Sequence, residues 1–305
     1  MRVGAIDIGT NTILLLIAEV QSGGSIQIIR DEHAIARLGK GIDADRVMKP
    51  QAFERAVEFL LRFKTILNAE QVDSVSVTAT SFLRDTKNKK EFVEYIRSRT
   101  GFEIRILTGD EEGNFTYQGA IDEFLQSENR GNFAVLDIGG GSTELSLGIG
   151  NQVLQRKSLD IGSVRLTERM LTTSPPTQKA IETARAYIRE QVAAFPLLPS
   201  SARLVGVAGT LTTLAAIELE LQQYDREAVS GHTLTYTTIQ SIFDDLSRRS
   251  LQELTSHPQI LPERADILVA GILILLVTME YLERKEITVS DRGLRYGVLL
   301  HSLPR

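Results

Sequence analysis

The chain has 305 residues, of which 42% are apolar and 24% are charged, and it carries a formal net charge of −5 and no cysteine. This composition is typical of a folded globular protein; it excludes disulfides, thiol nucleophiles and cysteine-ligated zinc, and it argues against global disorder and general nucleic-acid binding. The length exceeds the roughly 100 to 200 residues of one domain, so we expect two domains.

Two apolar segments bear on membrane targeting and insertion. Asp7 interrupts the apolar N-terminal segment before it reaches the length of a signal-peptide core, so we interpret this segment as mature structure. The longest apolar run, residues 267–279, is shorter than the roughly 20 residues that a membrane-spanning helix needs, and it predicts a buried helix. We therefore expect a cytoplasmic protein with no membrane partner and no DNA partner.

The spacing of apolar residues predicts alternating strands and helices along the chain. In the first half we expect strands at residues 3–8, 12–20, 72–78 and 104–107, and helices at residues 51–67, 89–100 and 110–125. In the second half we expect strands at residues 133–138, 143–149 and 203–207, and helices at residues 176–195 and 267–279. This alternation indicates an α/β fold.

The two halves of the chain contain a repeat. In each half, a short apolar strand ends in the tripeptide DIG, which contains Asp7 in the first half and Asp137 in the second. At the same offset Gly9 matches Gly139, and a second apolar strand follows in both halves. Such a repeat suggests two domains descended from one unit.

The acid in each repeat predicts a ligand. A buried carboxylate is costly unless it meets a cation or several donors, so Asp137 requires a partner. Glycines let successive backbone N–H groups converge on an anion, and hydroxyls add donors, so we predict phosphate binding by Gly139, Gly140, Gly141 and Ser142. An acid beside a phosphate is unfavourable unless a divalent cation lies between them, which makes Asp137 and Glu144 candidate metal ligands.

Two further turns have the same character. Asp7 is a third candidate metal ligand, and we predict that the turn after it binds phosphate through Gly9, Thr10, Asn11 and Thr12. Residues 205–213 form an apolar strand that leads into a predicted helix, whose free N–H groups favour anions, so Gly209 and Thr210 are further candidates. A single glycine turn after a strand usually only connects two elements, but the aspartate that precedes two of these turns favours phosphate binding.

Several segments resemble a known family. AIDIGTNT, VLDIGGGSTEL and VGVAGTLTTL resemble the two phosphate motifs and the adenosine motif of the actin-like ATPase, sugar kinase and Hsp70 fold. ATSFLRDTKN, TGDEEGNFTYQG and LPERADILVAG are similar to segments of the exopolyphosphatase and guanosine pentaphosphate phosphohydrolase family, and the likeness extends from Arg2 to His301.

The resemblance implies a fold and its boundaries. It implies two actin-like, ribonuclease H-like domains, each a mixed sheet flanked by helices, with the active site in the cleft between them. Domain I would span residues 1–125 and be completed by a C-terminal helix at about residues 293–305. Domain II would span residues 126–292.

The resemblance also implies an activity. Family members hydrolyse the terminal phosphoanhydride of inorganic polyphosphate, or the 5′ terminal phosphate of guanosine pentaphosphate, with Mg²⁺ or another divalent cation. The glutamate that activates the attacking water matches Glu112, the arginine that grips phosphate matches Arg84, and Asn88 follows closely. With Asp137 and its metal, these residues would provide the acceptor, cation and donors that phosphoryl transfer needs. We also allow for a homodimer.

Neighbouring charges have simpler interpretations. Glu111 is expected only to complement the dipole of the helix that starts beside it. Lys89 and Lys90 are expected to form a solvated helix start, although a longer polyanion could use them.

The sequence departs from the family pattern in three ways. Gly113 stands where the family has alanine, so we expect a helix that starts later or flexes. Tyr296 stands where the family commonly has a glutamate, which puts that glutamate's role in doubt. The chain also resembles a short form without the extra C-terminal helical domains, so we expect lower processivity on long polymers.

Three alternatives to exopolyphosphatase activity stay open at this point. The first is hydrolysis of guanosine pentaphosphate, because no residue clearly selects a guanine. The second is an actin-like kinase or ATPase that binds ATP through residues 205–213. The third is a catalytically weak sensor that binds polyphosphate or an alarmone.

Overall fold

The computed structural model describes residues 1–21, 26–40, 46–125 and 131–303, and internal contacts divide the chain into two compact units. Unit 1 comprises Met1–Gly119 and Leu294–Arg305, and unit 2 comprises Ala120–Gly293. The division falls inside helix α4 (Gly109–Leu125), before the boundary at residue 125 that the resemblance implies. The C-terminal segment belongs to unit 1.

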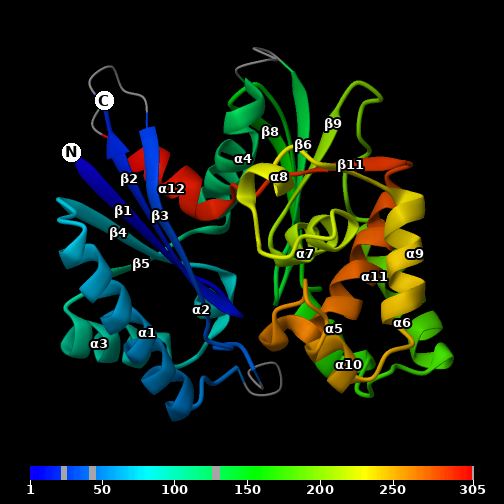
Figure 1. The fold of residues 1–305 in the computed structure, drawn as a ribbon, viewed down its shortest axis with the longest axis horizontal. Coiled ribbons are helices and arrows are strands. Elements are labelled where there is room, and N and C mark those ends of the chain that lie inside the picture. Colours follow the sequence, from blue (N-terminus) through cyan, green and yellow to red (C-terminus); the bar gives the residue numbers. More distant parts are fainter. Residues whose placement is uncertain (22–25, 41–45, 126–130, 304–305) are drawn as a thin grey trace. The chain divides into compact units, whose positions relative to one another are not determined.

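Unit 1 is built on a five-stranded mixed sheet with the order β3-β2-β1-β4-β5 (Figure 1). Strand β2 is antiparallel to both β1 and β3, whereas β4 runs parallel to both β1 and β5. The strands are β1 (Arg2–Ile8), β2 (Thr12–Val20), β3 (Ile26–Ile35), β4 (Ser74–Ala79) and β5 (Ile104–Ile106).

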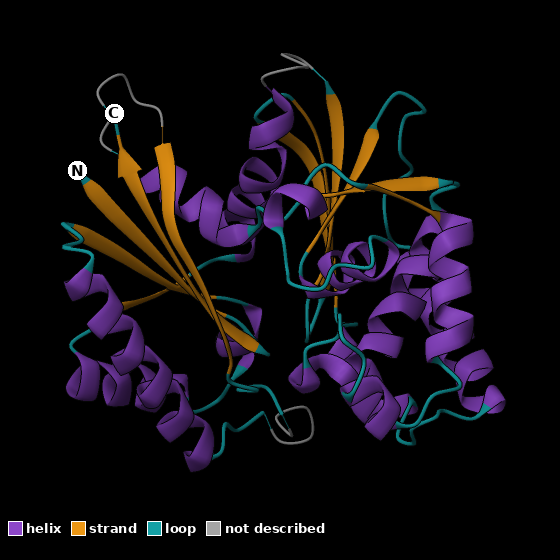
Figure 2. Ribbon diagram, in the orientation of Figure 1, coloured by secondary structure: helices purple, strands orange, loops and turns teal. Residues whose placement is uncertain are grey.

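Apolar side chains cover both faces of this sheet, because successive residues of a strand point to opposite faces. One face, with Ile6, Ile8 and Leu15, packs on helices α1 (Pro50–Ala69) and α3 (Lys89–Thr100). The opposite face, with Val3, Ala5 and Leu16, packs on α12 (Leu294–Ser302) and Phe115 of α4. Figure 2 shows these helices beside the strands. Both faces are therefore buried. The short helix α2 (Ser81–Asp85) follows β4 in the chain.

Unit 2 repeats this topology and adds one strand, β10, which is antiparallel to β11 at one edge of the sheet. Its sheet has the order β10-β11-β9-β6-β7-β8, in which β7 is antiparallel to β6 and β8 while β9 runs parallel to β6 and β11. The repeat predicted from the two DIG segments is thus confirmed in the strand order. The strands are β6 (Asn132–Ile138), β7 (Thr143–Ile149), β8 (Gln152–Leu159), β9 (Arg203–Val207), β10 (Thr233–Thr235) and β11 (Glu286–Val289).

The core of unit 2 is built around α11 (Ala265–Tyr281), which contains the longest apolar run of the chain. This helix is buried on nearly all sides and packs against α5, α6 and α9, so its uniform hydrophobicity is that of an internal helix. Within the described ranges, no helix is both long and apolar enough to cross a membrane. The other helices are α5 (Ser163–Met170), α6 (Gln178–Val192), α7 (Gly209–Glu218), α8 (Arg226–Val229), α9 (Tyr236–Leu246), α10 (Leu251–Thr255) and the 3₁₀ helix η1 (Pro262–Arg264).

Candidate active site

In unit 1, the candidate residues lie at one edge of the sheet. Ile8 at the end of β1 is paired with Ala79 at the end of β4, and Ala79 is paired with Ile106 at the end of β5. The carboxyl ends of parallel strands share an edge, which is where open α/β sheets place ligands. The turn after β1, helix α2 with Arg84 and helix α4 with Glu112 all begin at this edge.

The same arrangement recurs in unit 2. Asp137 near the end of β6 is paired with Val207 at the end of β9, so the turns that follow these strands leave the sheet next to each other. One of these turns starts at Gly139, and the other passes through Ala208 into helix α7, which begins at Gly209. Each unit therefore brings its own predicted phosphate residues together at one sheet edge.

The two DIG segments form equivalent turns. The Gly9 N–H donates to the Thr12 carbonyl at 2.8 Å, and the Gly139 N–H donates to the Ser142 carbonyl at 3.0 Å. Both bonds close a four-residue turn between antiparallel strands. The sequence repeat is therefore a repeat of local geometry, and the turn of unit 1 carries the polar side chains of Thr10, Asn11 and Thr12 where unit 2 has glycines and Ser142.

The loop that contains Arg37 and Gly39 holds the turn of unit 1 through backbone hydrogen bonds. The Arg37 N–H donates to the Asn11 carbonyl at 2.9 Å, and the Gly39 N–H donates to the Thr10 carbonyl at 2.8 Å. A side chain at Gly39 would clash with the Thr10 methyl group, so glycine is what allows the loop to approach this closely. These bonds fix the backbone of Thr10 and Asn11.

Helix α5 holds the turn of unit 2 in the same way. The Ser163 N–H donates to the Gly139 carbonyl at 2.9 Å, and the Val164 N–H donates to the Gly140 carbonyl at 2.9 Å. The first N–H groups of a helix lack partners within it, and here the turn carbonyls satisfy them. Gly162 precedes the helix and lies against the backbone of Gly140, a contact that sequence reasoning missed.

Gly162→Ala is expected to lower the free energy of unfolding by about 1–3 kcal/mol, because the added methyl group would overlap the backbone of Gly140. Urea unfolding followed by circular dichroism measures the change. Gly150→Asn is the matched control, because a Cβ atom at this position would meet no atom within 4 Å and asparagine tolerates the left-handed backbone there. Equal stability of Gly162→Ala and the wild type would contradict the close contact.

Asp7 is a buried acid with an unsatisfied oxygen. Its Oδ1 atom has no hydrogen-bond partner within the described part of the chain. The pKa of Asp7 is raised to about 7: burial is the largest cause, the negative charge of Glu112 also raises it, and the positive charge of Arg295 lowers it. A divalent cation would supply the missing partner for this carboxylate.

Asp137 and Glu144 lie opposite each other on β6 and β7. Asp137 is half-buried, while Glu144 is buried and accepts a hydrogen bond from the Ser158 hydroxyl at 2.6 Å. Among the residues placed by the structure, no three histidine, cysteine or acidic side chains form a group that could hold a metal. Mg²⁺ is often bound through only one or two carboxylates, with water and phosphate as its other ligands, so the donor set of either unit fits that ion.

Glu112 and Arg84 form an ion pair. The Arg84 Nη1 atom donates to Glu112 Oε2 at 2.5 Å and to the Leu107 carbonyl at 2.9 Å. The two side chains are only 27% and 12% exposed, so solvent screens the pair incompletely. Because α2 and α4 start at the same sheet edge, residues far apart in sequence meet here.

Glu111 has a different environment. Its carboxylate accepts bonds from the Thr108 N–H at 2.9 Å and hydroxyl at 3.0 Å and also pairs with Arg105. The backbone hydrogen bond from Thr108 lowers the pKa of Glu111, with Arg105 contributing. These contacts cap the start of α4, which begins at Gly109 and continues through Gly113. The later helix start expected from Gly113 is therefore wrong, because the cap and the buried face of α4 compensate for one glycine.

The structure shows structural contacts for two other candidates. Asn88 accepts from the Met48 N–H at 2.9 Å and donates to the Met48 carbonyl at 3.0 Å, so its phosphate role stays a prediction. The Lys89 ammonium bonds to the Arg84 carbonyl at 2.6 Å instead of remaining fully solvated.

The third turn opens helix α7. Gly209 is its first residue and follows Ala208, whose φ is 72°. The Arg264 guanidinium occupies the space that a side chain at Gly209 would fill, and Thr210 is buried against Gly271 of α11. The phosphate roles of Gly209 and Thr210 stay predictions. Arg264 lies in the segment LPERADILVAG, but the sequence did not predict that it would be a neighbour of this turn.

These features define a class of protein. Five strands have the corresponding order in the two α/β units, and in each unit an apolar strand with one aspartate leads into a turn of glycine and hydroxyl residues. The expected fold of two α/β units, each a mixed sheet flanked by helices, is therefore confirmed. The chain belongs to the Ppx/GppA phosphatase family, whose model matches residues 16–305.

Similar proteins agree with this membership. Exopolyphosphatase 2 of Mycobacterium tuberculosis (strain H37Rv) is 34% identical, and the match covers 98% of each chain. The crystal structure of the Aquifex aeolicus member of the Ppx/GppA family is 33% identical with a TM-score of 0.82, covering 99% of this chain and 97% of that one. A crystal structure of an exopolyphosphatase-like protein is 31% identical with a TM-score of 0.91, covering 98% and 97%.

Proposed function

We propose that this chain is an exopolyphosphatase, which hydrolyses the terminal phosphoanhydride of inorganic polyphosphate and releases orthophosphate. The Glu112–Arg84 pair carries the proposal, because it places a carboxylate and a guanidinium at 2.5 Å beside a glycine and hydroxyl turn. Phosphoanhydride hydrolysis needs an acceptor for the proton of water and donors for phosphate oxygens. The names of relatives similar over the full chain support polyphosphate as the substrate.

Each proposed group has one task. Glu112 accepts a proton from water, whose oxygen forms a bond to the terminal phosphorus. The bond from that phosphorus to the bridging oxygen breaks, and the shortened chain leaves with the electron pair. Arg84 and the N–H and hydroxyl groups of the two turns bind phosphate oxygens. A bound divalent cation, held through Asp7, Asp137 or Glu144, would neutralise phosphate charge.

Hydrolysis of guanosine pentaphosphate would use the same groups. The relatives named exopolyphosphatase do not favour it, and no contact among the described residues distinguishes a guanine. A cytoplasmic location and a homodimer belong to the proposal as further expectations.

Removal of the metal tests the function directly. We expect phosphate release from polyphosphate of medium length with Mg²⁺, and its loss when EDTA replaces the ion, because the acidic residues beside the turns would repel an unneutralised polyanion. Parallel assays with guanosine pentaphosphate compare the substrates. Release unaffected by EDTA would contradict the metal requirement, and no release from either substrate would contradict the proposed function.

A further inference from the structure

One face of the sheet in unit 1 carries two polar side chains, Asp31 and His33, that the proposed reaction does not yet use, beside Asp7, which it does. In the strand register, Asp7, Leu14 and His33 are aligned across β1, β2 and β3. Two residues away on the same strands, Ala5, Leu16 and Asp31 are aligned. Because alternate residues share a face, Asp7, Asp31 and His33 lie on the face that α12 covers.

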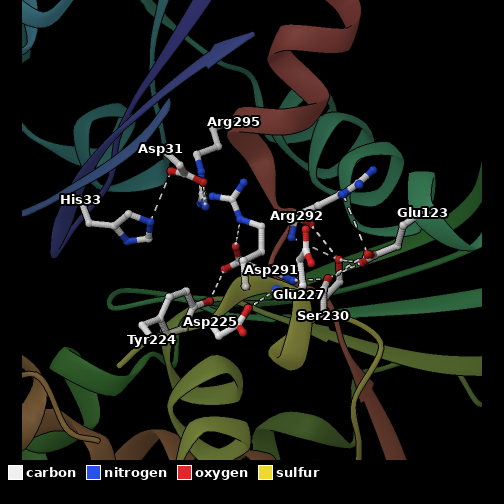
Figure 3. Close-up of polar contacts among 12 residues, drawn as sticks. Asp31, His33, Glu123, Tyr224, Asp225, Glu227, Ser230, Asp291, Arg292 and Arg295 are labelled. Atoms are coloured by element: carbon white, nitrogen blue, oxygen red, sulfur yellow. Dashed lines mark hydrogen bonds and ion pairs between the residues drawn. The ribbon is translucent and has the colours of Figure 1, made fainter. Parts of the chain in front are cut away.

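Arg295 enters this row from the first turn of α12. Its Nη2 atom donates to Asp31 Oδ2 at 2.8 Å, and the two side chains are only 6% and 5% exposed. The Nε2 atom of His33 lies 3.3 Å from the other carboxylate oxygen, and Figure 3 shows Asp31 between His33 and Arg295. Asp31 thus fixes the guanidinium of Arg295 in place.

The charge on Asp31 is stable in this position. Burial by itself would raise the pKa of Asp31, but the positive charge of Arg295 and the neighbouring His33 hold it well below its usual range. Asp31 is therefore ionised, and the pair with Arg295 is a buried ion pair.

Attachment of α12 does not explain this pair. A buried ion pair contributes little net stability, because removing both charges from water offsets their attraction. The helix already has apolar anchors in Tyr296 and Leu299, which are 1% and 0% exposed, and Gly297 lies directly against the backbone of Phe115. A hydrophobic pair could attach the helix equally well, so the charge of Arg295 calls for a second role.

That charge acts on the acids of the candidate site. Glu112 and Asp7 repel each other, whereas Arg295 attracts Asp7. Such forces are strong on a buried face because the local dielectric constant is low. Arg84 is already the partner of Glu112, so Arg295 is the cation that offsets Asp7.

We propose that Arg295, held by Asp31, is a positioning residue whose buried positive charge keeps the carboxylates of Asp7 and Glu112 in their working arrangement. The inference rests on the proposed function. Arg295 acts through these two acids and does not touch the substrate. It therefore affects the rate of the bound complex more than the binding of polyphosphate.

Steady-state kinetics on polyphosphate with Mg²⁺ test the role. In Arg295→Met we expect kcat to fall by about ten- to a hundred-fold with little change in KM, because small misplacement of reacting groups is costly. Arg295→Lys should recover part of kcat, and Asp31→Asn should lose less than Arg295→Met. Arg2→Met is the control, because it removes an arginine with ion pairs at the opposite end of β1.

Two outcomes would overturn the proposal. If Arg295→Met has the wild-type kcat per folded molecule, with folding checked by thermal unfolding, Arg295 has only a structural role. A raised KM with unchanged kcat would make Arg295 a substrate ligand. Crystal structures of the wild type and Arg295→Met give a readout without turnover: the proposal expects the Asp7 or Glu112 side chain to move, and unmoved side chains contradict it. If the wild type releases no phosphate, the proposed function is wrong. The two crystal structures still test whether Arg295 positions Asp7 and Glu112.

Discussion

Glu112→Gln is expected to lower kcat for phosphate release from polyphosphate by about 10²–10⁴-fold, because it removes the group that accepts the proton of the attacking water. The amide retains the size of the side chain and a carbonyl oxygen for Arg84, so the fold and the start of α4 should survive. Binding should change little, since the proposed phosphate ligands are untouched. Phosphate release at saturating polyphosphate measures kcat, and thermal unfolding measures the fold.

Glu111→Gln is the matched control for this substitution. Glu111 is the preceding residue on the same helix, and its carboxylate is occupied by Thr108 and Arg105. We expect it to retain most of the activity and to lose stability modestly, by about 0.5–2 kcal/mol, because it caps α4. Equal loss of kcat in both variants, or wild-type kcat in Glu112→Gln with retained polyphosphate binding, would show that Glu112 is not the acceptor.

Local patterns predicted the features of the chain that depend on neighbouring residues. The strands around both DIG segments, the helix at residues 89–100 and the strand at residues 203–207 were expected within a residue of their observed bounds. Each combines a strong apolar period with a clear turn signal, so local preference and tertiary packing agree. The repeat added evidence that no single segment carried.

Two edge strands, β3 and β8, were missed because they lack such a pattern. Strand β3 is only partly buried along most of its length, and β8 has the mostly polar sequence QVLQRKSL. Edge strands often carry charged and polar residues that discourage pairing with other chains, and this removes the alternation that identifies a strand. The short β10 and β11 offer too few residues for a periodic signal.

Contacts between distant segments could not be predicted from patterns either. The sequence placed Arg84 and Glu112 in separate motifs, and only the parallel pairing of β4 with β5 brings their helices together. The bond from Arg295 to Asp31 joins residues at opposite ends of the chain. The segment GLRYG was noted in the sequence only because Tyr296 departs from the family pattern. Tyr296 packs in the core, which gives no indication of a chemical role.

Arg84→Met is expected to lower kcat/KM for polyphosphate by about 10²–10³-fold, because a guanidinium on the transferring phosphate stabilises charge in the transition state. The loss should appear in both kcat and KM, since Arg84 would bind phosphate in the ground state too. Arg84→Lys keeps the charge but lacks the planar guanidinium that can bind two phosphate oxygens at once, so it should recover only part of the activity.

Because Arg84 is paired with Glu112, this substitution also tests whether phosphate must bind Arg84 before Glu112 can accept a proton. A phosphate group that takes up the guanidinium must compete with the carboxylate, so substrate binding would release Glu112 to accept a proton. Arg105→Met, which removes the partner of Glu111 in the same unit, should leave kcat/KM close to the wild-type value. If Arg84→Met instead raised kcat, Arg84 would act mainly as a restraint on Glu112 and not as a phosphate ligand. A loss confined to KM would assign it to binding alone.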